Sequence, residues 1–216
     1  MAVRGDIRVV LADDHAMVRE ALAQILQESG CMRVVGQAAD GPGAVDAALK
    51  LRPDVLVLDY SMPGLAAPEA LSSLRQLLPD LKVLVLTVHE NIHYCVKALE
   101  CGAHGYVVKS AAVGELVDAI KAVSVGEVYI SPKVSQKVIQ HLRRPKKERV
   151  GLESLSQREF ELLRLLGAGM SLKECADRLS ISTSSASTYR SRLLEKLNLK
   201  STAEVIRFAL ENDIVG

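Results

Sequence analysis

Short apolar runs alternate with longer amphipathic stretches from Ile7 to Val125. The apolar runs are rich in Val, Leu and Ile, are bounded by polar residues or glycine, and lie at Ile7–Leu11, Arg33–Gln37, Asp54–Leu58, Lys82–Leu86 and Gly105–Val108. This pattern is typical of strands that are buried on both faces. The amphipathic stretches predict helices at His15–Ser29, Gly43–Leu51, Pro68–Leu77, Asn91–Cys101 and Val113–Val125. Repeated strand–helix units of this size predict an α/β domain with a parallel sheet and helices on both faces.

The pattern weakens from about Tyr129 to Leu152. A helix at Lys133–Leu142 is compatible with the sequence, but Pro132 and the charged run Arg143–Arg149 interrupt the periodicity. The sequence therefore predicts a linker over residues 129–151, between a first domain at 1–128 and a second at 152–216. A solvated tether is the favoured role for the charged run, and a contact with nucleic-acid phosphates is the alternative.

The last part of the chain predicts four helices and no strands. Their ranges are Gln157–Leu166, Leu172–Leu179, Thr183–Leu197 and Thr202–Glu211. Three capping boxes indicate helix starts, because a serine is followed three residues later by glutamate at Ser156, Ser171 and Ser201. We therefore expect an all-α domain.

Charge divides the chain at the same place. Residues 1–130 contain 11 Lys and Arg against 16 Asp and Glu, and residues 131–216 contain 16 against 10. An acidic front and a basic back indicate two domains with different partners. We expect a cytoplasmic protein with no membrane partner, because no apolar run approaches a span and no secretory signal is visible. The four cysteines show no CxxC spacing and are expected to be small buried residues rather than zinc ligands or disulfides.

Polar side chains stand where the predicted strands end: Asp13, Asp14, Asp59, Thr87 and Lys109. All carboxyl ends of a parallel sheet lie at one edge, so these residues should share a pocket. Three carboxylates in one partly dry pocket repel one another, and a hard cation such as Mg²⁺ would remove that repulsion. Aspartate can accept a phosphoryl group as a nucleophile, with lysine and threonine stabilising the transferred oxygens. The pattern predicts a phosphoryl-accepting site.

Two enzyme interpretations compete with this site. The stretch from His89 to His93 matches H-E-x-x-H, the pattern of zinc peptidases, but His89 lies just beyond a strand and no third ligand is evident. A haloacid-dehalogenase-type phosphotransferase needs a second aspartate two residues after the first, and position 61 is Ser61. We therefore predict that the protein is not an enzyme; stoichiometric zinc in purified protein would indicate otherwise.

The second and third predicted helices of the last part form a helix-turn-helix pattern, with a tight turn around Ser180–Ser182. In this motif the later helix enters the major groove of DNA. Its predicted polar face carries small hydroxyl residues and one arginine: Ser184, Ser185, Ser187, Thr188, Arg190 and Ser191. Such residues can bond phosphates or base edges. A four-helix module that binds protein is the alternative at this point.

Residues 6–125 resemble the receiver domain of response regulators. The resemblance lies in Val10–His15, Leu58–Gly64, Leu86–Thr87 and Gly105–Lys109. It implies a flavodoxin-like fold with five strands in the order 2-1-3-4-5 and phosphorylation of Asp59 by a sensor histidine kinase or a small phosphodonor. It also implies that Mg²⁺ is held by Asp13, Asp14, Asp59 and the Ser61 carbonyl. Thr87, Tyr106 and Lys109 would be the phosphoryl-contact and switch residues.

Residues 152–211 resemble the LuxR-type helix-turn-helix of NarL/FixJ response regulators. The matching stretches are Leu155–Glu159, Leu162–Leu166, Lys173–Leu179, Ser187–Arg190 and Leu194–Leu197. The resemblance implies a double-stranded DNA operator, homodimers that pair through the last helix, and the DNA-binding residues Lys173, Ser184, Ser185, Ser187, Thr188, Arg190 and Lys196.

This chain departs from both families at particular positions. Many LuxR-type domains carry lysine where Ser184 stands, and its loss should lower DNA affinity and flatten its salt dependence. Receivers of this kind usually carry glycine where Ala67 stands, which would add strain if that backbone needs a positive φ. The predicted function is a transcriptional response regulator switched by phosphorylation of Asp59. The alternative is a DNA- or protein-binding regulator with a degenerate receiver that acts without phosphorylation.

Overall fold

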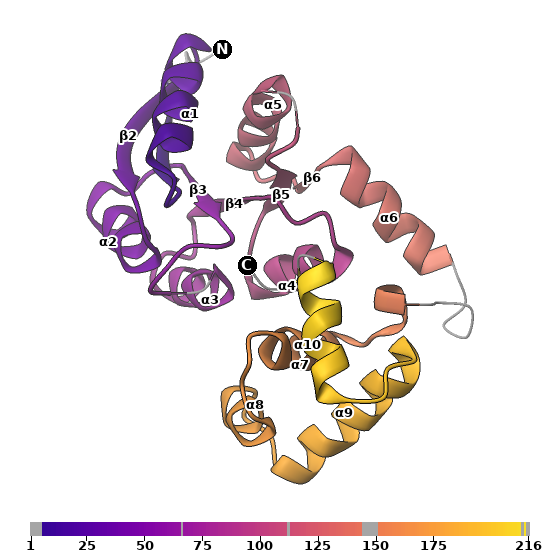
Figure 1. The fold of residues 1–216 in the computed structure, drawn as a ribbon. Coiled ribbons are helices and arrows are strands. Elements are labelled where there is room, and N and C mark those ends of the chain that lie inside the picture. Colours follow the sequence, from indigo (N-terminus) through magenta and orange to yellow (C-terminus); the bar gives the residue numbers. More distant parts are fainter. Residues whose placement is uncertain (1–5, 66, 112, 144–150, 213, 215–216) are drawn as a thin grey trace. The chain divides into compact units, whose positions relative to one another are not determined.

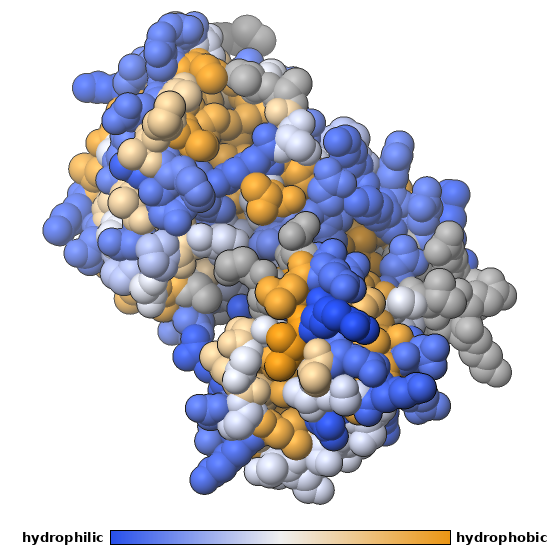
Figure 2. All heavy atoms as spheres, in the orientation of Figure 1, coloured by the Kyte–Doolittle hydropathy of each residue, from blue (hydrophilic) through white to orange (hydrophobic). Residues whose placement is uncertain are grey.

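The computed structural model describes residues 6–65, 67–111, 113–143, 151–212 and 214. The chain divides into two compact units, Met1–Lys137 and Val138–Gly216, and each is described on its own below. The first is an α/β unit and the second is helical (Figure 1). Hydrophilic side chains and smaller hydrophobic patches both lie on the surface that faces the viewer (Figure 2).

A parallel sheet forms the centre of the first unit. Its six strands are β1 Ile7–Ala12, β2 Met32–Ala38, β3 Val55–Asp59, β4 Lys82–Thr87, β5 Gly105–Val108 and β6 Tyr129–Ile130. They run in the order β2-β1-β3-β4-β5-β6. The flavodoxin-like order 2-1-3-4-5 is therefore confirmed for the first five strands. Burial on both faces is confirmed for β3 and β5, in which every residue is buried, and for most of β1 and β4. It is wrong for the edge strand β2, where most residues are half-buried or exposed.

Five helices connect the first five strands and follow the last of them. They are α1 Ala16–Glu28, α2 Gly41–Leu51, α3 Ala67–Leu77, α4 Ile92–Cys101 and α5 Val113–Ser124. The apolar sides of α1 and α5, including Leu26 and Ile120, pack against alternate residues of the central strands such as Val57 and Leu84. Helices α2, α3 and α4 form the layer on the other face (Figure 1). This layering holds the carboxyl ends of the strands in one row.

The sixth strand corrects the expected count of five. β6 has only two residues and pairs in parallel with β5, with Tyr129 opposite Gly105. Two residues are too few to show a periodicity, so the sequence pattern carries no signal for this strand. Gly105 permits the pairing, because a Cβ atom there would lie 3.0 Å from the Tyr129 carbonyl oxygen and 2.5 Å from Leu84 Cδ1.

The segment predicted as a linker begins with ordered structure. After β6, helix α6 runs from Pro132 to Arg143, close to the helix that the sequence allowed at Lys133–Leu142. Ser131, at the start of α6, is buried and its Oγ accepts a hydrogen bond from the Val108 N–H at 3.2 Å. The charged residues 144–150 lie outside the described residues, so both of their proposed roles remain predictions.

Four α-helices build the second unit: α7 Gln157–Gly167, α8 Leu172–Arg178, α9 Thr183–Leu197 and α10 Thr202–Glu211. A short 3-10 helix, η2 Gly151–Ser154, precedes them. The four predicted helices are confirmed within about a residue. Their core contains Leu162, Leu163, Ala186, Leu193 and Val205, all fully buried.

The capping boxes that the sequence predicts at three helix starts are complete at two of them. Both reciprocal bonds form at Ser156 and at Ser171. At Ser201 the serine accepts from the Glu204 N–H, but the Glu204 carboxylate accepts from the Lys200 N–H instead. The third box is therefore half formed, because the glutamate bonds one residue further upstream.

Ala67 carries no backbone strain of the kind that the family pattern raised. It is the first residue of α3 and is buried, and it is not among the described residues with positive φ. Gly64 supplies the positive φ in this loop, at +86°. Because Ala67 is not strained, its presence in place of glycine is no reason to regard the receiver as degenerate.

Two further expectations concern membranes and cysteines. Within the described ranges, no helix has both the length and the apolar character that crossing a bilayer requires. All four cysteines are free. Cys95 is fully buried, and burial raises the pKa of its thiol to about 12, which keeps it protonated and unreactive.

Candidate functional site: an acidic pocket and a polar helix

The carboxyl edge of the sheet brings the predicted pocket residues together. Asp13 follows β1 directly, Asp59 ends β3 and Thr87 ends β4, and all three are buried. Lys109 follows β5 and reaches back across the edge. Parallel pairing of β1 with β3, β3 with β4 and β4 with β5 aligns these ends in space although they lie up to 96 residues apart.

The Lys109 ammonium lies between two buried carboxylates. Its Nζ is 2.7 Å from Asp59 Oδ2 and 2.6 Å from Asp13 Oδ2. Burial opposes the charge of Lys109, but the bonds and charges of the two aspartates outweigh burial and raise its pKa above the ordinary value. The lysine is therefore charged at neutral pH, and its contact with Asp59 places a cation where phosphoryl oxygens would develop charge.

The acidic group also satisfies the requirements of a divalent-cation site. Asp13, Asp14, His15 and Asp59 each offer one ligand atom, and these atoms lie within 4.8 Å of one another. Asp13 Oδ2 is buried and faces the Lys109 Nζ at 2.6 Å, and this oxygen has no other hydrogen-bond donor among the described residues. Three carboxylates against one ammonium leave two negative charges, which matches an ion of charge +2. The His15 ring nitrogen lies 2.8 Å from Asp14 Oδ1.

Thr87 and Tyr106 are joined through one loop. The Thr87 Oγ1 accepts from the His89 N–H at 3.1 Å, and the Tyr106 hydroxyl donates to the His89 carbonyl at 2.8 Å. Burial, together with nearby charges, raises the pKa of Tyr106, so it stays a neutral donor. The Tyr106 ring is fully buried. A movement of Thr87 would therefore shift the backbone of His89, to which the Tyr106 hydroxyl is also bonded.

The side chain of His89 belongs to an aromatic group at the rim of this pocket. Its ring stacks on Tyr94 with centroids 4.2 Å apart, and Tyr60 meets both rings edge-on. The His89 Nε2 lies 3.2 Å from Ser61 Oγ. His93 is buried near the start of α4. In the described part of the chain, these histidines join no group of potential metal ligands, so the zinc-peptidase pattern has no geometric support.

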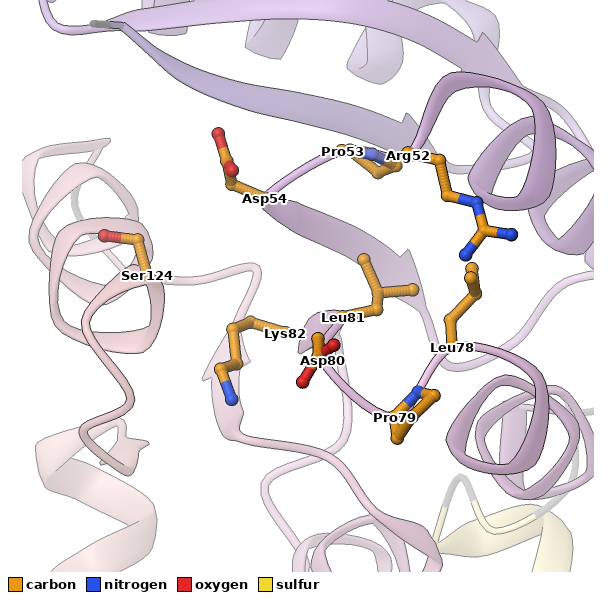
Figure 3. A pocket seen from close by; sticks show the side chains of 9 residues that line it. All are labelled: Arg52, Pro53, Asp54, Leu78, Pro79, Asp80, Leu81, Lys82 and Ser124. Atoms are coloured by element: carbon orange, nitrogen blue, oxygen red, sulfur yellow. The ribbon is translucent and has the colours of Figure 1, made fainter. Parts of the chain in front are cut away.

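A separate pocket lies at the opposite, amino-terminal edge of the sheet (Figure 3). It measures about 340 Å³ and its lining includes Asp54 before β3 and Lys82 at the start of β4. The lining mixes two acidic with two basic side chains around Leu78, Leu81 and two prolines. This arrangement favours no single ligand charge, and the residues predicted to accept the phosphoryl group are at the other edge.

Helix α9 presents much of the predicted DNA-contacting face to solvent. Ser182 caps it by accepting from the Ser185 N–H, and the αL residue Asn198 ends it. Among the predicted contacts, the exposed residues are Lys173 on α8 and Ser184, Ser187, Thr188 and Lys196 on α9, while Ser185 is half-buried. The region where α9 begins, lowest in the view, is pale in Figure 2 rather than blue, as expected for hydroxyl side chains.

Two of the predicted DNA contacts also have partners inside the second unit. The Arg190 Nε donates to Thr202 Oγ1 at 3.0 Å, and the side chain is half-buried. The Lys196 Nζ lies 2.7 Å from Glu159 Oε2 and donates to the Ser154 carbonyl at 2.9 Å. A DNA contact by Lys196 would have to break these bonds. The role of Arg190 and Lys196 in DNA binding remains a prediction.

Arg192 is a candidate that the sequence reasoning missed. It is exposed on α9, next to Ser191 and one turn after Thr188. The stretch that resembles the LuxR-type motif ends at Arg190, two residues before Arg192. The basic residues of the helix that follow the matched stretch were the signal that could have identified it.

We expect the Lys196–Glu159 pair to make the second unit sensitive to acid. Glu159 is 3% exposed, and although burial opposes its charge, bonds from Lys196 and Ser156 lower its pKa below 4.5. The ionised form therefore stabilises the fold fully above about pH 4.5, and this contribution is lost as pH falls through the folded-state pKa. We expect Glu159→Gln to cost about 1–2 kcal/mol at pH 7, discounted because Lys196 is 36% exposed.

Calorimetry between about pH 3 and pH 7 tests this expectation. The melting temperature of the helical unit should fall more steeply with acid in the wild type than in Glu159→Gln. The control is Glu195→Gln, which removes an exposed charge from α9. Parallel curves for the wild type and Glu159→Gln would show that the pair does not control acid stability.

Comparison with known proteins assigns both units to families. Residues 9–121 match the response regulator receiver domain, and residues 153–209 match the luxR family of bacterial regulatory proteins. The response regulator GacA of Pseudomonas viridiflava is 34% identical over 209 residues, covering 97% of this chain and 98% of its own. The oxygen regulatory protein NreC of Staphylococcus carnosus is also 34% identical, covering 97% and 99%.

Solved structures agree with these matches. A structure of the Salmonella typhimurium response regulator RcsB has a TM-score of 0.71 and 25% identity, covering 96% of this chain and 98% of its own. An RcsB–DNA complex has a TM-score of 0.63 and 26% identity, with 96% and 99% coverage. The fold and the acidic pocket thus define a receiver-containing response regulator. The chain belongs to the LuxR-type, NarL/FixJ response regulators of two-component systems, which are DNA-binding regulators of transcription.

Proposed function

We propose that Asp59 accepts a phosphoryl group from a sensor histidine kinase or a small phosphodonor, and that this raises the affinity of the protein for a DNA operator. The observation that carries the proposal is the Lys109 ammonium held between Asp13 and Asp59 at the carboxyl edge of the sheet. A buried carboxylate with a fixed cation beside it, rimmed by a threonine hydroxyl, supplies a nucleophile and the groups that stabilise transferred oxygens.

Phosphoryl transfer to this site needs no other nucleophile. An Asp59 carboxylate oxygen attacks phosphorus, a P–O bond to aspartate forms, and the bond from phosphorus to the donor's nitrogen or oxygen breaks as the donor departs. Lys109 turns from Asp59 toward the equatorial oxygens, and the Thr87 hydroxyl donates to one of them. Because Thr87 now holds the His89 N–H, this turn disturbs the loop that follows β4.

We propose that Mg²⁺ is the cofactor. The oxygens of Asp13, Asp14 and Asp59 would hold it, with the Ser61 carbonyl as a further ligand, since hard oxygen ligands suit this ion. When bound, the ion supplies two positive charges that offset the repulsion between the three carboxylates and the incoming phosphoryl group. Ser61 is near, because its N–H donates to Asp59 Oδ1 at 3.2 Å.

On the DNA side we propose that the exposed polar face of α9 enters the major groove. Its contacts would be Ser184, Ser187, Thr188 and Arg192, with Lys173 of α8 on the backbone. Homodimerisation on a two-fold operator is part of the proposal. A related solved structure, that of two RcsB dimers bound to two parallel DNAs, supports it.

The test uses an operator selected from random DNA. Anisotropy titrations of the full chain with acetyl phosphate and Mg²⁺ should give about tenfold or tighter binding than titrations without the phosphodonor. Equal affinity in both conditions would refute phosphorylation control and favour the degenerate-receiver alternative. The structure gives that alternative no specific support, since Ala67 is unstrained and the pocket residues meet.

Arg192→Ala should weaken operator binding about tenfold and reduce the slope of log affinity against log salt by about one, since one phosphate contact is lost. The matched control is Arg164→Ala, which removes an exposed arginine from α7. Titrations at three salt concentrations measure both quantities. An Arg192→Ala variant that binds like Arg164→Ala would exclude Arg192 from the interface.

A further inference from the structure

The loop between β4 and α4 carries a glutamate that contacts the helix leading out of the receiver. The Glu90 carboxylate lies 2.9 Å from Lys137 Nζ and 3.7 Å from Lys133 Nζ. Lys133 and Lys137 are four residues apart and so lie one turn apart on the same side of α6. The bond from Lys137, with further help from Lys133, lowers the pKa of Glu90, which is ionised at neutral pH.

Glu90 also lies beside both strand ends that carry phosphoryl contacts. It follows Thr87 by three residues, and the intervening His89 N–H is held by Thr87 Oγ1. Ser110, the residue directly after Lys109, donates its hydroxyl to Glu90 Oε1 at 3.4 Å. One carboxylate thus joins the loop after Thr87, the loop after Lys109 and helix α6.

Buried residues attach the start of helix α6 to the receiver. Its start is fixed by Ser131, whose N–H donates to the Tyr106 carbonyl at 2.9 Å, and by the buried Val134. Further along, Ile139 is exposed, and the first compact unit ends after Lys137. The Glu90 contacts are therefore the last described polar attachments of α6 to the receiver before the chain enters the second unit.

We propose that Glu90 is a positioning residue that transmits the state of the phosphoryl site to α6. With Asp59 unmodified, it holds Lys133 and Lys137; phosphoryl transfer releases them. The proposal rests on the proposed phosphorylation of Asp59. Release follows because Thr87 and Lys109 both turn toward the phosphoryl group, and the two loops that orient Glu90 move with them.

The strength of these contacts fits a switch rather than a permanent clasp. Glu90 and Lys137 are 36% and 45% exposed, so water and salt weaken their attraction. A strong buried pair would hold α6 in both states. A weak network changes the opening equilibrium of the helix about three- to tenfold, and it loses that effect in high salt.

Hydrogen exchange of the full chain tests the proposal through the backbone amides of α6. Glu90→Gln should raise their exchange rate about three- to tenfold without phosphodonor, and wild-type protein treated with acetyl phosphate and Mg²⁺ should reach a similar rate. Phosphorylated Glu90→Gln should exchange no faster than either. Glu127→Gln, an exposed glutamate elsewhere on the receiver, is the matched control and should resemble wild type. Reversing all three charges, with Glu90→Lys, Lys133→Glu and Lys137→Glu together, should restore protection.

An unchanged exchange rate in Glu90→Gln would overturn the proposal. It would also be overturned if phosphorylated Glu90→Gln exchanged faster than either single change, because the two effects on the α6 amides would then be independent. Phosphate-affinity gels run on the same samples separate the two hypotheses. Phosphorylated protein with fully protected α6 would refute the role of Glu90 and leave the proposed function standing. An absence of any phosphorylated species would refute both.

Discussion

Asp59→Asn will abolish phosphoryl transfer, with labelling by acetyl phosphate and Mg²⁺ reduced at least about a hundredfold, because an amide oxygen is a poor nucleophile at phosphorus. The loss will not come from unfolding. Asp59 is buried beside Asp13, and replacing one of two facing carboxylates by a neutral side chain of the same shape relieves repulsion. We therefore expect Asp59→Asn to melt no lower than the wild type in buffer without Mg²⁺.

Phosphate-affinity gels measure this result. Asp46→Asn is the matched control, because it makes the same chemical change at an exposed carboxylate on α2. The control should be labelled like wild type. Equal labelling of Asp59→Asn and Asp46→Asn would move the phosphoryl acceptor elsewhere in the chain, and the role given to Lys109 would lose its basis.

Lys109→Met will destabilise the receiver by about 2–4 kcal/mol without Mg²⁺, since it leaves Asp13 and Asp59 as buried charges with no cation between them. The range is below that of a fully buried pair because Lys109 is 17% exposed. Mg²⁺ should recover most of this loss, because an ion that binds only the folded state stabilises it. The gain from Mg²⁺ should be larger in Lys109→Met than in wild type.

Urea unfolding of the wild type and of Lys109→Met, each in chelator and in millimolar Mg²⁺, gives the four free energies of unfolding that this comparison needs. Lys121→Met, an exposed lysine on α5, controls for loss of one positive charge. If Lys109→Met unfolds like Lys121→Met, the ammonium does not hold the acidic pocket together. If Mg²⁺ stabilises neither the wild type nor Lys109→Met, the three carboxylates do not form a cation site.

Much of the fold could be predicted because its signals are local. The five apolar runs became the first five strands, and strict capping pairs such as Ser156 with Glu159 indicated helix starts. The sixth strand was missed because two residues carry no periodicity, and Gly105 leaves room for Tyr129 to approach. The half-formed box at Ser201 shows that a glutamate three residues on can choose a different amide.

The acidic pocket was predictable for a different reason. A parallel sheet forces all strand ends to one edge, so five polar residues at four strand ends could be placed together without knowing any side-chain contact. The sequence could not show that Lys109 bridges Asp13 and Asp59, or that His15 lies against Asp14. Those contacts depend on side-chain rotamers and on loop paths that no spacing encodes.

The availability of side chains on the proposed DNA-contacting face was the least predictable part. Assigning residues from a family motif treats each position alone, whereas Lys196 pairs with Glu159 across 37 residues of chain. Arg190 likewise bonds Thr202 of another helix, and Arg192 is exposed in its place. Burial and internal pairing decide which cations of a helix remain available, and both come from tertiary packing.

The central claim is that separate loops bring Asp13, Asp14, Asp59, Thr87 and Lys109 into one cation-holding pocket that accepts a phosphoryl group on Asp59. A crystal structure of the full chain with Mg²⁺ and beryllofluoride, a mimic of the phosphoryl group, tests it most directly. We predict beryllofluoride on Asp59, within hydrogen-bond distance of Thr87 Oγ1 and Lys109 Nζ, with Mg²⁺ on the aspartate oxygens. Beryllofluoride on another carboxylate, or Thr87 and Lys109 turned away from it, would contradict the account.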